Sequence, residues 1–278
     1  IMPTPANLYQ VRVDDPDSLV ATPLSNEGPE GNYPTPDARF HVTLQGDHVY
    51  WQESVLSDSR RGNGQFTAAV MRQRLGTSGD PQPVAEDAWY PTIDHCSANP
   101  RLVYIHDDFT TRGEPRDRSV EAVDIAGTDV GEPTVLYDAP ATLRELTSAT
   151  ACGPHVAVGG MERPPTALDE QFLECGRAFA LAQGPEGTRE LTWDELDTFA
   201  SGVAYMSANP HGVAFRVHGL RTAGRDFWWP WGGDPLYLTD YSDTNAQLQA
   251  GDGWIGFHLS VDETYAGPWA QLDLASAQ

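Results

Sequence analysis

Residues 97–105 read Ser-Ala-Asn-Pro-Arg-Leu-Val-Tyr-Ile, and residues 207–215 read Ser-Ala-Asn-Pro-His-Gly-Val-Ala-Phe. In both stretches the same turn-forming tetrapeptide leads into a run of aliphatic and aromatic residues, which is typical of a turn followed by a β-strand. The interval between the copies leaves room for two units of about 55 residues, a spacing that indicates a repeat architecture.

Three more turn-then-strand stretches extend the series. Gly46-Asp47 leads into Val49, Cys152-Gly153-Pro154 leads into Val156, and Gly251-Asp252-Gly253 leads into Ile255. With the strands at Val103 and Val213 they mark five units at steps of roughly 42 to 57 residues. A period of this length predicts that each unit is one small sheet stacked on its neighbours.

Each unit is expected to form four short antiparallel strands, because Gly, Pro, Asp and Asn interrupt its apolar runs. The sequence therefore predicts an all-β protein, a five-bladed β-propeller built from one domain of residues 1–278. The blades are expected at roughly 38–87, 88–139, 142–195, 197–241 and 243–278. Two further strands are expected within residues 8–24, and we expect one of them to close the ring by pairing into the last blade.

The runs Val49-Tyr50-Trp51 and Val103-Tyr104-Ile105 each follow an expected inner strand and a short turn. This arrangement resembles the repeat of the TolB-like β-propeller superfamily. The usual Ser-Pro-Asp-Gly turn of that superfamily is replaced here by Ser-Ala-Asn-Pro, Cys-Gly-Pro or Gly-Asp-Gly. The resemblance implies the fold and an extracytoplasmic binding role, and it carries over no catalytic residue.

Charge excludes two classes of partner. The chain has 40 acidic residues against 17 basic ones, a formal net charge of −23, and every basic residue is Arg. A field of this sign repels nucleic acid and anionic lipid, so neither is expected as a main partner. The sequence has no apolar run of about 18 residues, so no insertion of this chain into a membrane is expected.

The opening Ile1-Met2-Pro3 and the Pro-rich segment after it favour a mature exported form, so a secreted or cell-surface location is expected. The three cysteines, Cys96, Cys152 and Cys175, match no zinc spacing and fit one disulfide with one free thiol. Cys152 is expected in a turn on the opposite face from the other two. Pairing of Cys96 with Cys175 is therefore favoured over the alternatives.

Side chains on the expected inner strands are candidates for ligand binding, because inner strands of a propeller line its channel. His41, Asp94, His95 and Tyr205 are the polar residues that we expect to bind there, unless the channel holds only water. An Asp and a His side by side suggest acid–base chemistry or a metal site. Adjacent residues on a strand point to opposite faces, however, so Asp94 and His95 do not readily share one target.

The aromatic stretch at residues 226–234 contains Trp228, Trp229 and Trp231 around Pro230, ahead of two glycines. It is not expected to form a regular strand. Exposed indole rings stack on sugars or anchor a protein partner, so these residues are candidates for ligand binding. The other interpretation, which is favoured over binding, is that the rings pack between neighbouring blades.

The sequence holds no Gly-x-Ser-x-Gly elbow, His-Glu-x-x-His motif, P-loop or Gly-x-Gly-x-x-Gly motif. Inner-strand acids remain as candidate glycosidase carboxylates, namely Asp37, Asp94, Glu145 and Asp197. No cofactor is expected. Ca²⁺ is considered for the acidic stretches 14–17 and 240–243, which lack the spacing of a known calcium loop.

The leading expectation is a non-catalytic binding or scaffold propeller that recognises a protein or a glycan at the channel mouth or at the Trp-rich stretch. One alternative is a carbohydrate-active hydrolase or lyase that uses inner-strand carboxylates. Another is an architectural subunit of a surface assembly.

Overall fold

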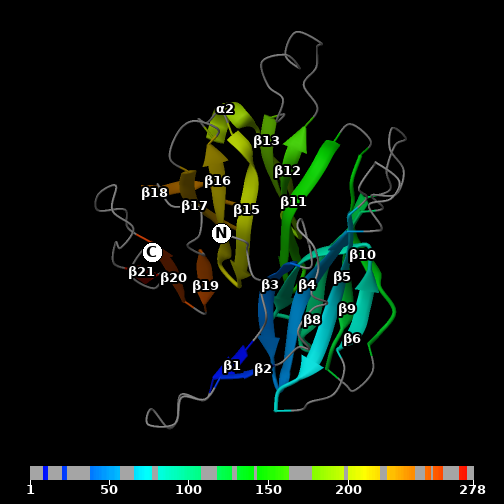
Figure 1. The fold of residues 1–278 in the computed structure, drawn as a ribbon. Helices are drawn as coiled ribbons and strands as arrows, with labels where there is room; N and C mark the ends of the chain where they lie inside the picture. Colours follow the sequence, from blue (N-terminus) through cyan, green and yellow to red (C-terminus); the bar gives the residue numbers. More distant parts are fainter. Residues whose placement is uncertain are drawn as a thin grey trace, which may run out of the picture. The chain divides into compact units, whose positions relative to one another are not determined.

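The structure of the chain, a computed structural model, describes residues 9–11, 21–23, 38–56, 66–76, 81–107, 118–126, 130–140, 143–162, 177–196, 200–219, 224–241, 248–251, 253–258 and 269–273. In these residues antiparallel sheets follow one another along the chain, and the strands of each sheet lie in chain order (Figure 1). The expected all-β fold with four-stranded antiparallel sheets is confirmed.

Five sheets make up most of the described residues. The first sheet contains β3 (Ala38–Gln45), β4 (His48–Leu56), β5 (Phe66–Arg74) and β6 (Gln82–Glu86). The second contains β7 (Ala88–Asp94), β8 (Arg101–Asp107), β9 (Arg118–Asp124) and β10 (Thr134–Asp138). The third contains β11 (Leu143–Cys152), β12 (His155–Glu162), β13 (Arg177–Gly184) and β14 (Gly187–Leu191).

The fourth sheet contains β15 (Ala200–Asn209), β16 (Gly212–Gly219), β17 (Gly224–Pro230) and β18 (Leu236–Tyr241). The fifth contains three described strands, β19 (Gln249–Gly251), β20 (Trp254–His258) and β21 (Trp269–Asp273). Each sheet falls inside one of the five units expected from the repeat. The described strands form no closed sheet.

The two N-terminal strands pair with each other. β1 (Tyr9–Val11) and β2 (Ala21–Pro23) form their own antiparallel sheet, with Tyr9 opposite Pro23 and Val11 opposite Ala21. The expected pairing of one of these strands into the last sheet is therefore wrong for the described residues. A hairpin between neighbouring strands closes a short loop, which costs less entropy than joining the two ends of the chain.

The chain divides into two compact units, residues 1–93 with 104–117 and residues 94–103 with 118–278. In the first unit, Val49 and Trp51 of β4 are buried against Met71 and Leu75. The side chains of Val49 and Trp51 lie on one face of β4, and the residues that alternate with them lie on the other face, as expected for a strand covered on both sides. The prediction of a single domain stays a prediction.

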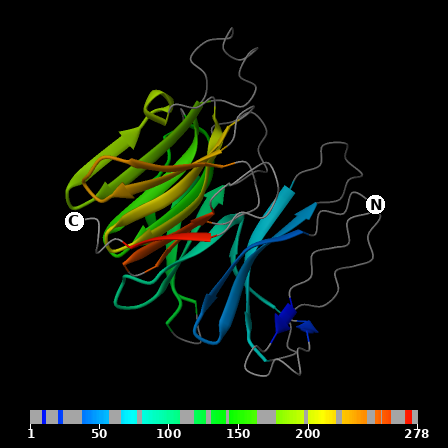
Figure 2. The ribbon, with the colours of Figure 1, turned by 90° about the vertical axis from the view of Figure 1, so that its left-hand side faces the viewer.

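In the second unit the fourth sheet is covered on both faces. Phe227 and Trp229 of β17 belong to a buried cluster that includes Ala180 of the third sheet. Trp228, between them in sequence, belongs to a different cluster with Ile255 of the fifth sheet. Figures 1 and 2 show the third sheet in green beside the fourth in yellow to orange.

This arrangement corrects the expectation that the Trp-rich stretch is irregular. Residues 224–230 form the regular strand β17, and Trp228 and Trp229 are 3% and 1% exposed. Successive side chains of a strand point to opposite faces, and here both faces are buried, so the run is apolar without alternation.

One short helix, α2 (Trp193–Leu196), follows β14 among the described residues. Glu195 provides one half of a capping box, because its carboxylate accepts the backbone N–H of Thr192 at 2.9 Å. Leu196 is fully buried and fixes the helix to the third sheet. Sequence reasoning missed this helix, although the Thr-x-x-Glu spacing was visible.

Within the second unit, the first strands of successive sheets are linked by serine side chains. The Oγ of Ser148 on β11 accepts the backbone N–H of Met206 on β15 at 3.0 Å. The Oγ of Ser207 on β15 accepts the backbone N–H of Ala250 on β19, also at 3.0 Å. One strand therefore joins both neighbouring sheets. No helix among the described residues has the length and apolar character needed to cross a membrane.

Candidate functional site

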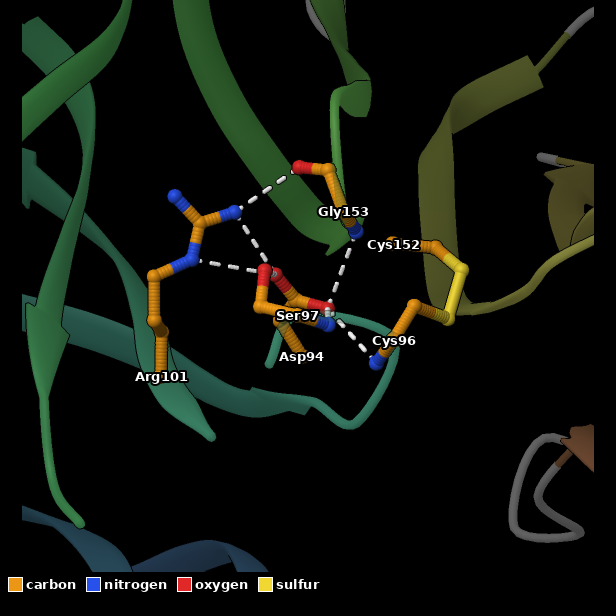
Figure 3. A network of polar contacts seen from close by, with 6 residues as sticks. All are labelled: Asp94, Cys96, Ser97, Arg101, Cys152 and Gly153. Carbon is orange, nitrogen blue, oxygen red and sulfur yellow. Dashed lines mark hydrogen bonds and ion pairs between the residues drawn. A yellow bond between two sulfur atoms is a disulfide. The ribbon is translucent and has the colours of Figure 1, made fainter. Parts of the chain in front are cut away.

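Asp94 ends β7 and lies at the centre of a polar network in the second unit (Figure 3). Its Oδ1 accepts the backbone N–H groups of Cys96, Ser97 and Gly153 at 2.9, 3.1 and 3.0 Å. Its Oδ2 accepts the Ser97 hydroxyl at 2.6 Å and two N–H groups of Arg101 at 3.0 and 2.6 Å. The fully buried carboxylate is thus surrounded by donors.

Arg101 completes a clamp on the next sheet. Its Nη2 donates to the carbonyl of Gly153 at 2.9 Å, while Asp94 accepts the N–H of the same glycine. Gly153 has a φ of +60°, so the turn between β11 and β12 uses a conformation that favours glycine. One ion pair therefore holds both backbone groups of a single turn residue.

The network sets the protonation of Asp94. Burial raises the pKa of its carboxyl, but hydrogen bonds from Ser97, Arg101 and the N–H groups of Gly153 and Cys96 outweigh burial. The pKa of Asp94 is therefore below its ordinary value. A carboxylate held ionised and saturated with donors is suited to fixing a turn, and it is not suited to exchanging protons with a substrate.

A disulfide joins Cys96 to Cys152 beside this clamp, with the Cα atoms 4.8 Å apart (Figure 3). The expected Cys96–Cys175 pair is wrong, and Cys175 lies outside the described residues. Cys96 follows β7 and Cys152 ends β11, so both occupy the first turn of their sheets. Equivalent turns of successive sheets lie on the same side, which the sequence argument had placed on opposite faces.

Asn209 repeats the role of Asp94 at the end of β15. Its Oδ1 accepts the N–H groups of His211 and Gly212 at 2.8 and 3.2 Å. Its Nδ2 donates to the carbonyl of Gly251 in the fifth sheet at 2.7 Å. A short polar side chain that ends a first strand thus shapes its own turn and binds the next sheet.

His95 is exposed next to Asp94, and no described contact brings the two side chains to one target. Strand β7 ends at the buried Asp94, so the exposed His95 lies outside the strand and the expected alternation does not apply to this pair. Of the other candidate carboxylates, Glu145 is half-buried on β11. Asp37 and Asp197 lie outside the described residues.

His41 and Tyr205 lie on the first strands of the first and fourth sheets, as expected. Both have a left-handed backbone, with φ of 52° and 53°, at points where the strand register shifts. Burial lowers the pKa of His41 to about 4, so its imidazole is neutral at physiological pH. Tyr205 lies over the guanidinium of Arg216, which is 5.7 Å from the ring centroid.

Arg216 and Asp226 form a buried ion pair between β16 and β17 that sequence reasoning missed. Nε and Nη2 of Arg216 donate to the two carboxylate oxygens of Asp226 at 2.7 and 2.9 Å. Both side chains are 0% exposed. Arg216 and Asp226 are directly opposite each other in the register. Residues of opposite charge at facing positions of neighbouring strands were therefore the pattern that could have predicted this pair.

Trp231 differs from Trp228 and Trp229 because it is only partly buried. Its ring stacks on His155 with centroids 4.6 Å apart, and its Nε1 donates to the carbonyl of Asn209. His155 Nε2 is 3.2 Å from the carboxylate of Glu186. The group joins turns of the third and fourth sheets, so Trp231 too is used in packing between sheets.

No group of three or more His, Cys, Asp or Glu side chains among the described residues is arranged to hold a metal ion. The acidic stretch 14–17 lies outside them. In the stretch 240–243, only the backbone of Asp240 and Tyr241 is described. Binding of Ca²⁺ stays a prediction.

No protein-family model matches the chain, and no curated protein matches its sequence. Among solved structures, the chain is similar to acylaminoacyl peptidase of Pyrococcus horikoshii, with 10% identity and a TM-score of 0.48. The match covers 82% of this chain and 36% of the peptidase, so the chain spans about a third of that protein.

Two further solved structures are similar. The β-propeller domain of the trilobed protease from Pyrococcus furiosus has 8% identity and a TM-score of 0.44, with 81% of this chain and 79% of that chain covered. A puromycin-hydrolysing peptidase of Mycobacterium tuberculosis has 11% identity and a TM-score of 0.38, with 87% and 53% covered. A TolB-like protein is not among these three.

These matches correct the expected function. The similar structures are two peptidases and the β-propeller domain of a protease. None of them is named as a stand-alone, non-catalytic propeller that recognises a protein or a glycan, as a carbohydrate-active hydrolase or lyase, or as an architectural subunit of a surface assembly.

Proposed function

We propose that the five sheets are the successive blades of one β-propeller. The support comes from the second unit, where the first strand of the fourth sheet contacts both neighbours through Ser148 and Ser207. Sheets that meet at their first strands, with the other strands following outward in chain order, have the arrangement of propeller blades.

For the role of this propeller, we propose that it is a module of a peptidase-type hydrolase that attracts cationic peptides. The single observation that carries this proposal is the pairing of arginines with aspartates of the same chain. Four arginines of the described residues are bound to aspartates of the chain itself, in the pairs Arg74–Asp47, Arg101–Asp94, Arg189–Asp234 and Arg216–Asp226.

With these arginines neutralised, the excess of acidic residues behind the net charge of −23 determines the surface field. A field of this sign raises the local concentration of positively charged ligands and speeds their encounter. The sequence has no Gly-x-Ser-x-Gly elbow, so in this proposal the module delivers or selects peptides while another part of the enzyme supplies the reacting groups.

The test uses the purified chain and three fluorescein-labelled peptides of equal length, one rich in Arg and Lys, one uncharged and one rich in Asp and Glu. Fluorescence anisotropy in 50 mM and in 300 mM NaCl should show binding of the cationic peptide that weakens at high salt. Mass spectrometry of the same mixtures should find the peptides intact. Equal binding of all three peptides would overturn the charge argument, and cleavage would show that the chain supplies the reacting groups itself.

We also propose that the protein works outside the cytoplasm. The Cys96–Cys152 disulfide supports this, because disulfides persist in oxidising compartments and are rare in the cytosol.

A further inference from the structure

Two separate links join the turn that follows β7 to the turn that follows β11. One is the Cys96–Cys152 disulfide. The other is the carboxylate of Asp94, whose Oδ1 accepts the backbone N–H groups of Cys96 and Gly153 at 2.9 and 3.0 Å. All four residues belong to the second unit. One oxygen atom therefore holds the backbone of the first cysteine and of the residue next to the second cysteine (Figure 3).

The clamp formed by Asp94 and Arg101 uses no sulfur atom. Arg101 donates to the carboxylate of Asp94 at 2.6 Å and to the carbonyl of Gly153 at 2.9 Å. The two turns also approach closely, because a Cβ placed on Gly153 would lie 3.9 Å from the carbonyl oxygen of Cys96. Opening of the disulfide breaks none of these contacts. The clamp is therefore expected to keep the two cysteines beside each other after reduction.

A junction in the same unit shows that a polar side chain joins sheets without a disulfide. Asn209 ends β15 as Asp94 ends β7, and its Nδ2 donates to the carbonyl of Gly251 in the fifth sheet at 2.7 Å. None of the three cysteines of the chain lies in that junction. The bond between Cys96 and Cys152 is therefore an addition to a junction that the clamp already makes.

The two cysteines differ in their access to solvent. Cys152 is 2% exposed, whereas Cys96 is half-buried and follows directly after the exposed His95. The rate of thiol–disulfide exchange depends on access and on which sulfur is attacked. An incoming thiol therefore reaches the bond from the side of Cys96, and Cys152 provides the leaving sulfur.

We propose that Cys96 and Cys152 form a reversible thiol–disulfide pair within the folded protein, and that Asp94 is the positioning residue that keeps the pair aligned. The partner in the exchange is a dithiol. This inference goes beyond the proposed function and does not depend on the binding of peptides.

The exchange has two steps. A thiolate of the dithiol attacks Sγ of Cys96, the protein disulfide breaks, and Sγ of Cys152 leaves with the electron pair and takes a proton from water. The second thiolate of the dithiol then attacks the dithiol's own sulfur in the mixed disulfide. This step releases Cys96, which is also protonated, and leaves the dithiol as a cyclic disulfide. The protein gains two electrons and two protons, and the dithiol loses the same number.

Alignment of the cysteines enters this equilibrium as the effective concentration of one thiol toward the other. A clamp that holds both turns raises the effective concentration in the folded state, so the disulfide forms more readily. A general loss of stability does not lower the effective concentration while both redox forms stay folded. The positioning role of Asp94 can therefore be separated from its contribution to stability.

The experiment equilibrates the full chain, without denaturant, in mixtures of reduced and oxidised dithiothreitol. Alkylation with excess N-ethylmaleimide, followed by mass spectrometry, gives the fraction of protein that contains the Cys96–Cys152 disulfide. Asp94→Asn and Arg101→Lys should each lower the equilibrium constant for disulfide formation by about tenfold, because each weakens a charged hydrogen bond to Gly153. In the reduced wild type, iodoacetamide should label Cys96 before Cys152.

The matched control is Asp226→Asn, which weakens the buried ion pair with Arg216 in the fourth sheet of the same unit. It should destabilise the protein and leave the redox equilibrium unchanged. Circular dichroism identifies the variants that are folded in both redox forms. If Asp94→Asn does not fold, Arg101→Lys carries the test, because the Arg101 side chain is 23% exposed and its replacement keeps the charge.

A fall of the equilibrium constant in the clamp variants alone supports the positioning role, whether or not the labelled cationic peptides bind. An unchanged constant in the folded clamp variants, or an equal fall in Asp226→Asn, overturns that role. A wild-type protein that unfolds when it is reduced overturns the reversible pair, and labelling of Cys152 before Cys96 overturns the order of attack.

Discussion

The carboxylate of Asp94 accepts the backbone N–H of Gly153 at 3.0 Å, although the two residues are 59 positions apart in sequence. The contact joins the end of one first strand to the first turn of the next sheet. Arg101 binds the carbonyl of the same glycine, so the ion pair and the turn form one unit. The stability of this junction is therefore open to mutation at single positions.

Asp94→Ala is expected to destabilise the protein by about 3 to 5 kcal/mol, because it leaves Arg101 without its partner and removes acceptors from buried donors. Urea unfolding followed by tryptophan fluorescence measures the change. The matched control is Asp47→Asn, an exposed carboxylate that pairs with Arg74 of the same sheet, and it should change stability little. Equal effects of the two substitutions would contradict the clamp.

Acid should reveal the same residue. The folded-state pKa of Asp94 is below its ordinary value, so its contribution is fully present above the unfolded pKa of about 3.9. That contribution is lost as the pH falls through the folded value. Below pH 4 the wild-type protein should therefore lose stability more steeply than Asp94→Asn. Parallel curves in urea unfolding at stepped pH would count against an ionised Asp94.

His41 should act in a different pH window. Its pKa falls from an ordinary 6.5 to about 4 on folding, so the unfolded chain binds the extra proton first. Stability should decline as the pH drops from about 6.5 to about 4, by at most about 3 kcal/mol for this residue. His41→Asn should remove that part of the decline, while His155→Asn serves as the comparison.

Reduction of the disulfide should weaken the second unit. Opening a loop of this size lowers the free energy of unfolding by about 4 kcal/mol, according to the chain-entropy relation. Cys96→Ser with Cys152→Ser should unfold at lower urea than the oxidised wild type and match the reduced wild type. Peptide mapping without reductant should recover Cys96 joined to Cys152, and a Cys96–Cys175 peptide would refute the pairing.

The buried ion pair offers a test of charge against packing. Arg216→Met alone leaves Asp226 buried without its partner and should cost about 3 to 5 kcal/mol. Combining it with Asp226→Leu should recover most of that loss, because an apolar pair of similar volume needs no desolvated charge. A double variant as unstable as the single one would show that the pair has a further role.

The sequence was sufficient to predict the sheets, but it was insufficient to predict the contacts between them. Turn residues recur at a near-constant interval, and that interval alone located the strands around Val49, Val103, Val156 and Val213. The regular strand that contains Trp228 and Trp229 was not predicted, because a strand buried on both faces does not alternate between apolar and polar residues. The bulges at His41 and Tyr205 were missed because no local sequence pattern predicts a left-handed residue within a strand.

The cysteine pairing shows the same limit from another side. Cys96 and Cys152 follow or end the first strands of successive units, so an alignment of the repeats by their turns puts both on one side. The expectation placed the turn of Cys152 on the opposite face from Cys96 and Cys175, and it therefore chose the wrong partner. Contacts between sheets depend on which edges of the turns meet, and this information is absent from the period itself.

The disulfide also governs how the protein responds to cutting. A protease that cleaves once anywhere between Cys96 and Cys152 produces two fragments that remain covalently joined. The nicked protein migrates as one band until a reductant is added, and its sheets stay tethered long enough to pair again.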